Sequence, residues 1–328
     1  MGALPAVSVI DRASVSVARE RVRSVAAEAG FDHEGIEALA LLVSELAQNQ
    51  LDHARSTGVI GVERILRGGI AGIEIVARDR GPGITSPADA VAGMVVPRGL
   101  GAGLPSVRRL ASELDLCVVA SEGTQIRARR FVGPVPRHPE VASLGRGMEQ
   151  PCGDRSWVRR TEGALLLAVI DGVGHGTLAR EAADRAVGVL DASTRRDPVS
   201  LLLAIDEACR GTRGVAASIA RWNIGARTVE VAGVGNVAVH LYAPGQASRA
   251  LLPTPGVLGV RSPQRVTAAR TFPTMERSVL ILHTDGVSSR TITDPAGEGL
   301  FRSPVRVADL LMSRGGKGHD DALLLVAR

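Results

Sequence analysis

The sequence predicts two domains that both mix helices with strands: an α/β sandwich, followed by two packed sheets flanked by helices. The chain has 328 residues, enough for about two domains. Helical and strand periodicities are mixed in the first half, whereas the second half holds many strand-like runs and a few paired helices. Pro134 and Pro136 interrupt any regular element between the halves, because prolines cannot donate backbone hydrogen bonds. We expect domains at 1–133 and 138–328, joined by a linker at 134–137.

The first half opens with apolar residues at helical spacing, which predict an amphipathic helix that ends before Gly30. A second helix of the same kind follows after a short turn. Strand-like runs and one further helix complete this half. The expected elements, in order, are helices at 14–29 and 33–53, strands at 59–66 and 70–78, a helix at 104–113, and strands at 114–120 and 124–132.

The second half opens with an expected loop at 145–154 and a fully apolar strand at 164–170. Two helices and a series of strands follow, and a helix and a strand close the chain. The expected elements are helices at 178–190 and 198–210, strands at 215–222, 228–232, 237–242, 266–272 and 278–283, a helix at 305–313 and a strand at 322–327.

Composition excludes several classes of function. The net charge of +5 comes from the second half, because residues 1–133 hold 15 bases and 15 acids, and no run of five bases occurs. The chain has only seven aromatic residues, which argues against a surface that binds single-stranded nucleic acid by stacking aromatic rings on the bases. Three widely spaced cysteines predict neither a disulfide framework nor a zinc site. Without a membrane span or signal-peptide core, we expect a cytoplasmic protein that binds neither membrane nor nucleic acid.

Three elements of the first half predict a nucleotide pocket. Glu45, Asn49 and His53 follow one another at helical spacing and form a polar stripe. Asp79 comes at the end of a predicted strand and is followed by Gly81 and Gly83, which let backbone approach a ligand closely. The run Gly99-Leu100-Gly101-Ala102-Gly103 then opens a helix, where unpaired N–H groups can receive phosphate oxygens.

This order of motifs resembles the GHKL class of ATPases and kinases, and within it the RsbT-type switch kinases. The resemblance implies a serine/threonine kinase domain in which Asn49 holds the Mg²⁺ of bound ATP and Glu45 acts as the base toward the attacking hydroxyl. It further implies that Asp79 accepts a hydrogen bond from the adenine amino group. The other implied ATP-binding residues are Gly81, Gly83, Gly99, Gly101, Gly103 and Thr124.

Four aspartates of the second half have neighbours that suit a dinuclear metal site: Asp154, Asp171, Asp285 and Asp320. The last three directly follow or precede an apolar strand, so one end of a sheet would carry their carboxylates. Mg²⁺ and Mn²⁺ prefer such oxygen ligands. Asp320 is followed by Asp321, and the sequence does not separate the two as ligands.

These blocks resemble the PPM protein phosphatases, in particular the SpoIIE and RsbX branch, and imply an αββα sandwich. The resemblance implies that Asp171 bridges two Mg²⁺ or Mn²⁺ ions, that the Gly172 carbonyl contacts one ion, and that Asp154, Asp285 and Asp320 complete the shells. Water would then attack phosphoserine or phosphothreonine directly.

Together the resemblances imply a bifunctional partner-switching regulator that acts on STAS-domain antagonist or stressosome proteins. Two alternatives stay open. Either only the phosphatase is active and the first domain senses ATP, or the first domain is a non-enzymatic module that binds a sigma factor or a STAS scaffold.

Overall fold

The computed structural model describes residues 6–54, 57–94, 103–148, 151–260, 268–293 and 300–328. The chain divides into two compact units, Met1–Val141 and Ala142–Arg328, each described by itself below. Residues 134–137 belong to the first unit, where the carbonyl of Pro136 accepts a hydrogen bond of 3.2 Å from Arg67 Nη1. The mixed α/β class predicted from the sequence is confirmed in both units.

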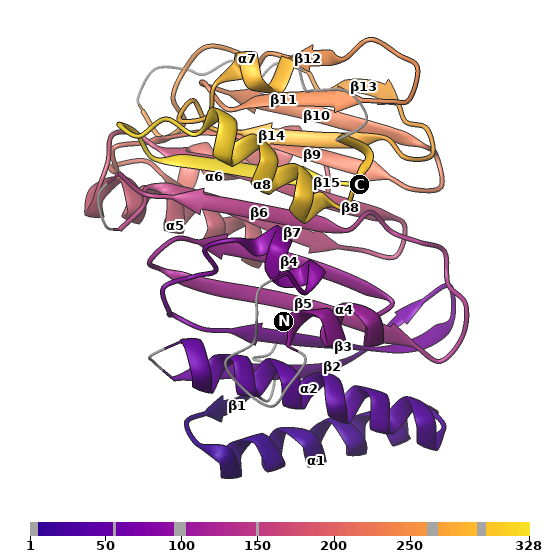
Figure 1. Ribbon diagram of the computed structural model, residues 1–328. Helices are drawn as coiled ribbons and strands as arrows, with labels where there is room; N and C mark the ends of the chain where they lie inside the picture. Colours follow the sequence, from indigo (N-terminus) through magenta and orange to yellow (C-terminus); the bar gives the residue numbers. More distant parts are fainter. Residues whose placement is uncertain (1–5, 55–56, 95–102, 149–150, 261–267, 294–299) are drawn as a thin grey trace. The chain divides into compact units, whose positions relative to one another are not determined.

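The first unit contains an antiparallel sheet with the strand order β1-β2-β3-β5-β4 (Figure 1). Alternating buried residues such as Ile73 and Ile75 on the long third strand give the sheet a core face. The strands are β1 (Ala6–Val9), β2 (Gly58–Arg67), β3 (Ile70–Arg78), β4 (Glu113–Val119) and β5 (Gly123–Phe131).

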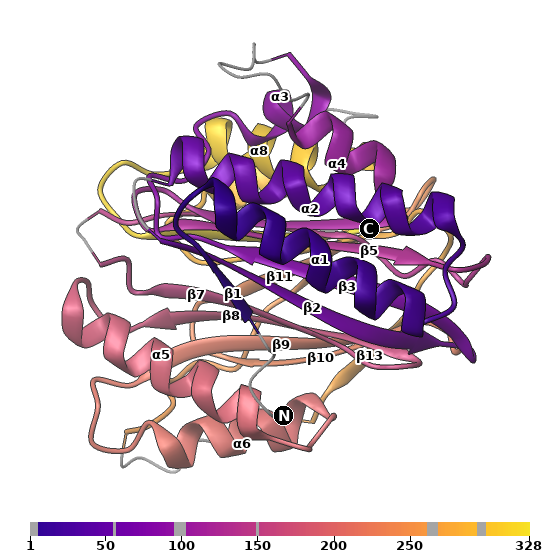
Figure 2. The same cartoon turned by 90° about the horizontal axis from the view of Figure 1, so that it is seen from below.

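Two long helices, α1 (Arg12–Glu28) and α2 (His33–His53), pack against each other and on this sheet (Figure 2). Aspartates start both helices: Asp11 accepts a hydrogen bond from the N–H of Ser14, and Asp32 from the N–H of Gly35, each at 2.8 Å. Such caps satisfy N–H groups that have no partner inside the helix. The sequence predicts α2 and β3 at the bounds that the structure shows.

A correction concerns the helix predicted at 104–113. Helix α4 (Leu104–Leu110), which follows the short α3 (Pro87–Ala92), ends earlier, and Glu113 is the first residue of β4. Glu113 is opposite Arg129 in the sheet, and its carboxylate is bound by Arg67 of β2. Partners distant in sequence therefore fix Glu113 in a strand, and local periodicity does not reveal them. The structure also contains β1 and α3, which the sequence pattern did not predict.

The second unit contains two sheets. One has the order β13-β10-β9-β8-β7, and in the other the strands of this unit follow the order β6-β15-β14-β11-β12. The first-named sheet consists of β7 (Asp154–Arg160), β8 (Ala164–Gly172), β9 (Val215–Asn223), β10 (Thr228–Val234) and β13 (Arg270–Pro273). The second consists of β6 (Val141–Arg146), β11 (Ala238–Tyr242), β12 (Arg249–Leu251), β14 (Val279–His283) and β15 (Ala322–Ala327).

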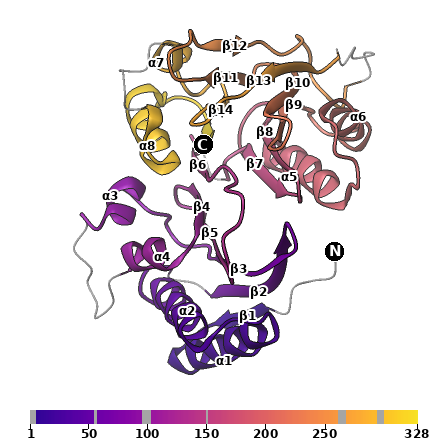
Figure 3. The same cartoon turned by 90° about the vertical axis from the view of Figure 1, so that its right-hand side faces the viewer.

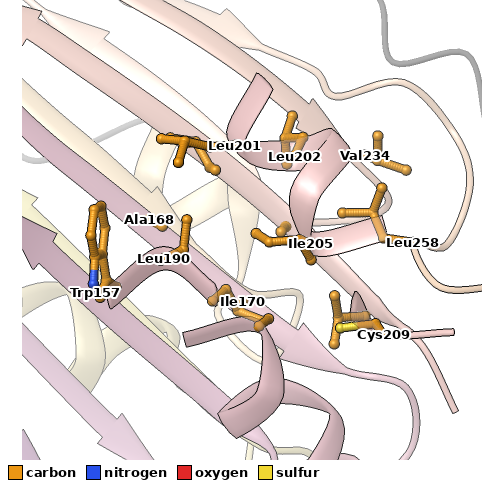
Figure 4. Packing of buried hydrophobic residues seen from close by; sticks show 14 of the residues in the cluster. Trp157, Ala168, Ile170, Leu190, Leu201, Leu202, Ile205, Cys209, Val234 and Leu258 are labelled. Atoms are coloured by element: carbon orange, nitrogen blue, oxygen red, sulfur yellow. The ribbon is translucent and has the colours of Figure 1, made fainter. Parts of the chain in front are cut away.

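Helices cover the outer faces of both sheets, which gives the αββα layering visible in Figure 3. Helices α5 (Thr177–Ala192) and α6 (Pro198–Ala208) pack on the sheet of β7–β10, and α8 (Pro304–Gly315), preceded by α7 (Ser289–Thr293), packs on β15. Beneath α5 and α6 lies a buried apolar cluster that includes Leu190, Ile205 and Ile170 (Figure 4). This core fixes the end of β8, the strand that carries Asp171.

Corrections in the second unit concern mainly its shorter or more polar elements. Four elements were not predicted from the sequence: β6, β7, β12 and α7. Asp154 begins β7, whereas the sequence pattern predicted a loop there. Strand β7 carries three arginines and is the last strand in its sheet order, so its sequence lacks the apolar run of a central strand. In the predicted strand 266–272, β13 begins only at Arg270, and residues 266 and 267 lie outside the described ranges.

No helix of the described ranges combines the length and the apolar character that crossing a lipid bilayer requires.

Candidate functional sites

In the second unit, the four predicted aspartates occupy strand ends of both sheets. Asp154 and Asp171 lie directly opposite each other on the antiparallel strands β7 and β8. Asp285 follows the end of β14, and Asp320 precedes the start of β15. Because β14 and β15 are antiparallel neighbours, the end of one and the start of the other lie at the same edge. The topology thus forms two pairs of aspartates, Asp154 with Asp171 on one sheet and Asp285 with Asp320 on the other.

Hydrogen bonds tie the two sheets together at these pairs. The hydroxyl of Thr284, which follows β14, donates to Asp154 Oδ2 over 2.8 Å and accepts from the N–H of Leu323 over 2.9 Å. The N–H of Gly153 donates to Asp321 Oδ2 over 2.6 Å. The four aspartates are therefore held at one end of the sandwich, which we call the acidic end.

Asp320 and Asp321 differ in their surroundings. Asp321 is buried, and backbone N–H groups occupy both of its carboxylate oxygens: Met148 at 2.7 Å and Gly153 at 2.6 Å. Asp320 is partly exposed, and its Oδ1 accepts from the N–H of Asp321. Asp321 therefore holds the loop around residues 148–153 in place, whereas the side chain of Asp320 is not occupied in this way. Partial burial, and then the charge of Asp285, raise the pKa of Asp320.

Asn236, which follows Gly235 before β11, connects two of the aspartates. Its Nδ2 donates to Asp285 Oδ2 over 2.7 Å, and the Asn236 side chain also forms a hydrogen bond with Asp171. A single neutral amide thus holds carboxylates of both sheets. Neither Asn236 nor Thr284 was among the residues predicted from the sequence to form the site. Their position could have identified them, because each is a polar residue next to a glycine or an aspartate at the end of a buried strand.

Crowding and burial raise the pKa values of these carboxyl groups. Burial, and then the charge of Asp285, raises the pKa of Asp171 to about 7, although the hydrogen bond from Asn236 acts in the opposite direction. Burial, and then Asp171, raises the pKa of Asp154 well above its ordinary value. The charged forms are costly because these groups have been removed from water and repel one another. A bound cation would offset both effects.

The acidic end fits hard divalent cations in its donor chemistry. Its available ligands are carboxylate and carbonyl oxygens, which Mg²⁺ and Mn²⁺ prefer, and buried charges of one sign require a counter-ion. No group of three or more His, Cys, Asp or Glu side chains in the described ranges forms a ready coordination shell.

In the first unit, Glu45, Asn49 and Gly103 come together. Glu45 Oε2 accepts a hydrogen bond of 2.8 Å from the N–H of Gly103, which precedes α4 in a left-handed conformation with φ of 60°. A Cβ at Gly103 would lie 3.9 Å from Asn49 Oδ1. The amide nitrogen of Asn49 is buried, and no described residue hydrogen-bonds to it. This group of residues thus includes a buried hydrogen-bond donor that a ligand could satisfy.

Asp79, Gly81, Gly83 and Thr124 form a second group, at the ends of β3 and β5. Asp79 Oδ1 accepts from the N–H of Gly81 at 2.8 Å and of Thr124 at 3.3 Å. A Cβ at Gly81 would approach Ala54 Cα to 2.6 Å, so this position requires glycine. Gly83 has a positive φ of 79°. Gly99 and Gly101 lie outside the described ranges.

Comparisons with known proteins match both units. Residues 161–328, slightly more than half of the chain, match the family described as "Stage II sporulation protein E (SpoIIE)", and residues 10–130 match the "Histidine kinase-like ATPase domain". The serine/threonine-protein kinase RsbT of Bacillus subtilis (strain 168) is 40% identical over 119 residues, which are 36% of this chain and 89% of RsbT. The phosphoserine phosphatase RsbX of the same organism is 30% identical over 148 residues, 45% of this chain and 73% of RsbX.

A solved structure of RsbX in complex with magnesium is 26% identical and has a TM-score of 0.53, covering 59% of this chain and 96% of that one. Fold and comparisons together define a class: an RsbT-like, kinase-type ATPase domain joined to an RsbX-like phosphatase domain of the PPM type. The chain belongs to the stage II sporulation protein E (SpoIIE) family.

Proposed function

We propose that the second unit hydrolyses phosphoserine or phosphothreonine side chains of a protein with Mg²⁺ or Mn²⁺ as cofactor. The observation that carries this proposal is the convergence of Asp154, Asp171, Asp285 and Asp320 at the acidic end. Within the described ranges, the hydrogen-bond donors to these carboxylates are neutral groups, namely the Thr284 hydroxyl, the Asn236 amide and a backbone N–H. Neutral donors leave the negative charge uncompensated, and divalent cations are suited to that task.

In this proposal Asp171, Asp154, Asp285, Asp320 and the carbonyl of Gly172 would hold the cations. When bound, the cations lower the pKa of water and neutralise the phosphate. Hydrolysis forms a P–O bond from water and breaks the bond between phosphorus and the seryl oxygen, which leaves as the hydroxyl. The residues of the chain position these groups: β7 and β8 fix the spacing of Asp154 and Asp171, and the Asn236 amide donates a hydrogen bond to Asp285.

For the first unit we propose ATP-dependent phosphorylation of a serine or threonine. Asn49 would hold Mg²⁺, Glu45 would orient or deprotonate the attacking hydroxyl, and Asp79 would bind the adenine amino group. Asn49 Oδ1, an oxygen ligand of the kind that Mg²⁺ prefers, lies beside Gly103 and supports this assignment, as does the fixed position of Glu45. Phosphoryl transfer depends mostly on positioning and charge neutralisation, which these groups can supply. Gly81, Gly83, Gly99, Gly101, Gly103 and Thr124 would line the ATP site.

The two activities in one chain would set the phosphorylation level of a single protein class. We propose that this class is the STAS-domain antagonists and scaffolds of partner-switching systems. The similarity of the units to a serine/threonine kinase and a phosphoserine phosphatase supports the proposal. Opposing enzymes on one substrate make its modification responsive to ATP and to divalent cations.

The phosphatase proposal is tested with the purified chain, Mn²⁺ and a phosphorylated STAS-domain protein. Asp171→Asn should abolish phosphate release, whereas Glu207→Gln, which removes an exposed charge on α6 of the same unit, should leave it unchanged. Full Mn²⁺-dependent turnover by Asp171→Asn would overturn the metal assignment.

The kinase proposal is tested with labelled ATP, Mg²⁺ and the unphosphorylated STAS-domain protein, in the Asp171→Asn background so that label is retained. Asn49→Ala and Glu45→Gln should each lose transfer, and Glu34→Gln, an exposed acid on the same helix, serves as the control. If ATP binds without transfer, the first unit is an ATP sensor. If a sigma factor co-purifies and no transfer occurs, the first unit is a binding module.

A further inference from the structure

The composition of the chain singles out one basic residue beside the acidic end. Lys317 is its only lysine, whereas the other 38 of the 39 basic residues are arginines. An ammonium group differs from a guanidinium in being a compact charge with rotatable donors on a flexible stem. The lysine also lies in the short loop that leads to Asp320.

The backbone of Lys317 is fixed on both sides. Its N–H donates to the carbonyl of Gly286, the residue after Asp285, over 2.7 Å. Its carbonyl accepts a hydrogen bond of 2.7 Å from Nη2 of Arg146 at the end of β6. The N–H of Ser288 donates to the carbonyl of Gly315 over 2.8 Å, so the loop runs antiparallel to residues 286–288. Lys317 is thereby anchored next to one proposed metal ligand and three residues before another.

Backbone contacts therefore place Lys317 at the acidic end, between Gly286 on one side and Asp320 further along its own loop. Its ammonium is near enough to Asp320 and to His283, at the end of β14, for its charge to act on both. The side chain of Lys317 is only partly buried, so its ammonium remains accessible to a group that arrives from solvent.

We propose that Lys317 is a substrate-binding residue whose ammonium receives the phosphate group of the phosphoseryl or phosphothreonyl side chain at the acidic end. This inference rests on the proposed phosphatase function. A phosphate monoester brings about two negative charges to a site that is already acidic, so a cation that is not a metal ligand favours its approach. A flexible ammonium also follows the phosphate as its geometry changes, which a planar guanidinium does less readily.

The kinetic test compares wild type with Lys317→Gln and Lys317→Arg on a phosphoserine peptide at saturating Mn²⁺. Lys317→Gln should raise KM about tenfold, the loss expected for a charge-assisted hydrogen bond, with kcat changed less than about twofold. Lys317→Arg should recover part of this loss. The control, Arg314→Gln, removes one exposed positive charge three residues away and should leave KM unchanged.

A second readout does not depend on turnover. Because Lys317 has the only side-chain amine in the chain, acetylation by an amine-reactive reagent can be followed by mass spectrometry of its peptide. Inorganic phosphate with Mn²⁺ should slow this acetylation severalfold, and an equal concentration of chloride should not.

The outcomes separate the two proposals. If wild type turns over, but phosphate gives no protection and Lys317→Gln retains the wild-type KM, Lys317 does not bind the phosphate and the phosphatase function stands. If wild type shows no cation-dependent turnover on any phosphoserine or phosphothreonine substrate, the proposed function fails and the role of Lys317 fails with it.

Discussion

The two units each bury a group of charged side chains, but they balance the charge differently. In the first unit, Arg129 and Arg67 face Glu74, Glu113 and Asp115 across the strands β2 to β5. Arg129 pairs with Glu74 at 2.6 Å and with Asp115 at 2.8 Å, and Arg67 donates to Glu113 Oε2 at 2.9 Å. Burial acts to lower the pKa of Arg129, but Asp115 and Glu74 more than offset it, so the pKa is raised. Guanidinium groups of the chain itself thus stabilise these carboxylates.

At the acidic end of the second unit, carboxylates face carboxylates. Burial and neighbouring aspartates raise the pKa values of Asp154 and Asp171, and the hydrogen-bond donors that oppose this rise are the neutral groups of Thr284 and Asn236. A chain that neutralises one buried acidic group internally and leaves another uncompensated marks the second as a site for an external cation. The balance of charge therefore separates a structural cluster from a functional one.

The largest effect is expected in the balanced cluster. Arg129→Met leaves Glu74 and Asp115 buried without a counter-charge, which should lower the free energy of unfolding by about 3–5 kcal/mol. Urea denaturation measures this change. Arg127→Met on the same strand removes a longer, more exposed pair with Glu74 at 3.6 Å and should cost less than about 1 kcal/mol. Equal losses in the two variants would contradict the view that charge balance stabilises this cluster.

The next prediction separates Asp320 from Asp321. Asp321→Asn replaces a buried acceptor of two backbone N–H groups by an amide, and should lower stability by about 1.5–3 kcal/mol in metal-free protein. Asp320→Asn should instead leave stability unchanged or raise it, because it removes a repelling charge, and should weaken Mn²⁺ binding about 10- to 100-fold. Calorimetric titration with Mn²⁺ and thermal denaturation give the two readouts. If Asp321→Asn is the variant that loses Mn²⁺ and keeps its stability, the assignment is reversed.

The sequence predicts the central elements of both units well, because their patterns are local. Helix α2 and strands β3 and β15 have the predicted bounds. The polar strand β7 and the short β12 were missed although each pairs with its neighbour in sequence, because β7 carries three arginines and β12 has only three residues. In the site, strand ends reveal Asp171 and Asp285, but the acids to which Thr284 and Asn236 donate follow only from the assembled sheets, because these partners are 130 and 49 residues away in sequence. Domain limits and site roles stay predictions.

The pH dependence follows from Asp171. Its pKa is about 7 in the folded, metal-free protein against an ordinary value of 3.8. Between these values the native state holds a proton that the unfolded chain has released, so the free energy of unfolding should fall as pH rises from about 4 to about 7. Mn²⁺ removes the repulsion and should therefore stabilise the protein more at pH 8 than at pH 5.5, by about 1–2 kcal/mol.

Thermal denaturation with Mn²⁺ and with a chelator, at both pH values, measures this difference. Asp171→Asn should make the metal-free protein less sensitive to pH in this range. Cation stabilisation of equal size at both pH values would show that the acidic end is not the cation site.

The smallest effect is expected for Asn236, whose amide helps to stabilise the acidic end when no cation is bound. Asn236→Ala removes the amide that hydrogen-bonds to Asp285 and Asp171, and should lower the stability of metal-free protein by about 1 kcal/mol at pH 8. With saturating Mn²⁺ the loss should shrink, because the cation then supplies the attraction that the amide supplied. If Asn236→Ala lowers stability as much with Mn²⁺ as without it, Asn236 stabilises the packing of the loop before β11 and does not offset the repulsion between the carboxylates. A loss confined to the metal-free protein would support neutral hydrogen bonds as the means by which the chain tolerates a cation site before it is filled.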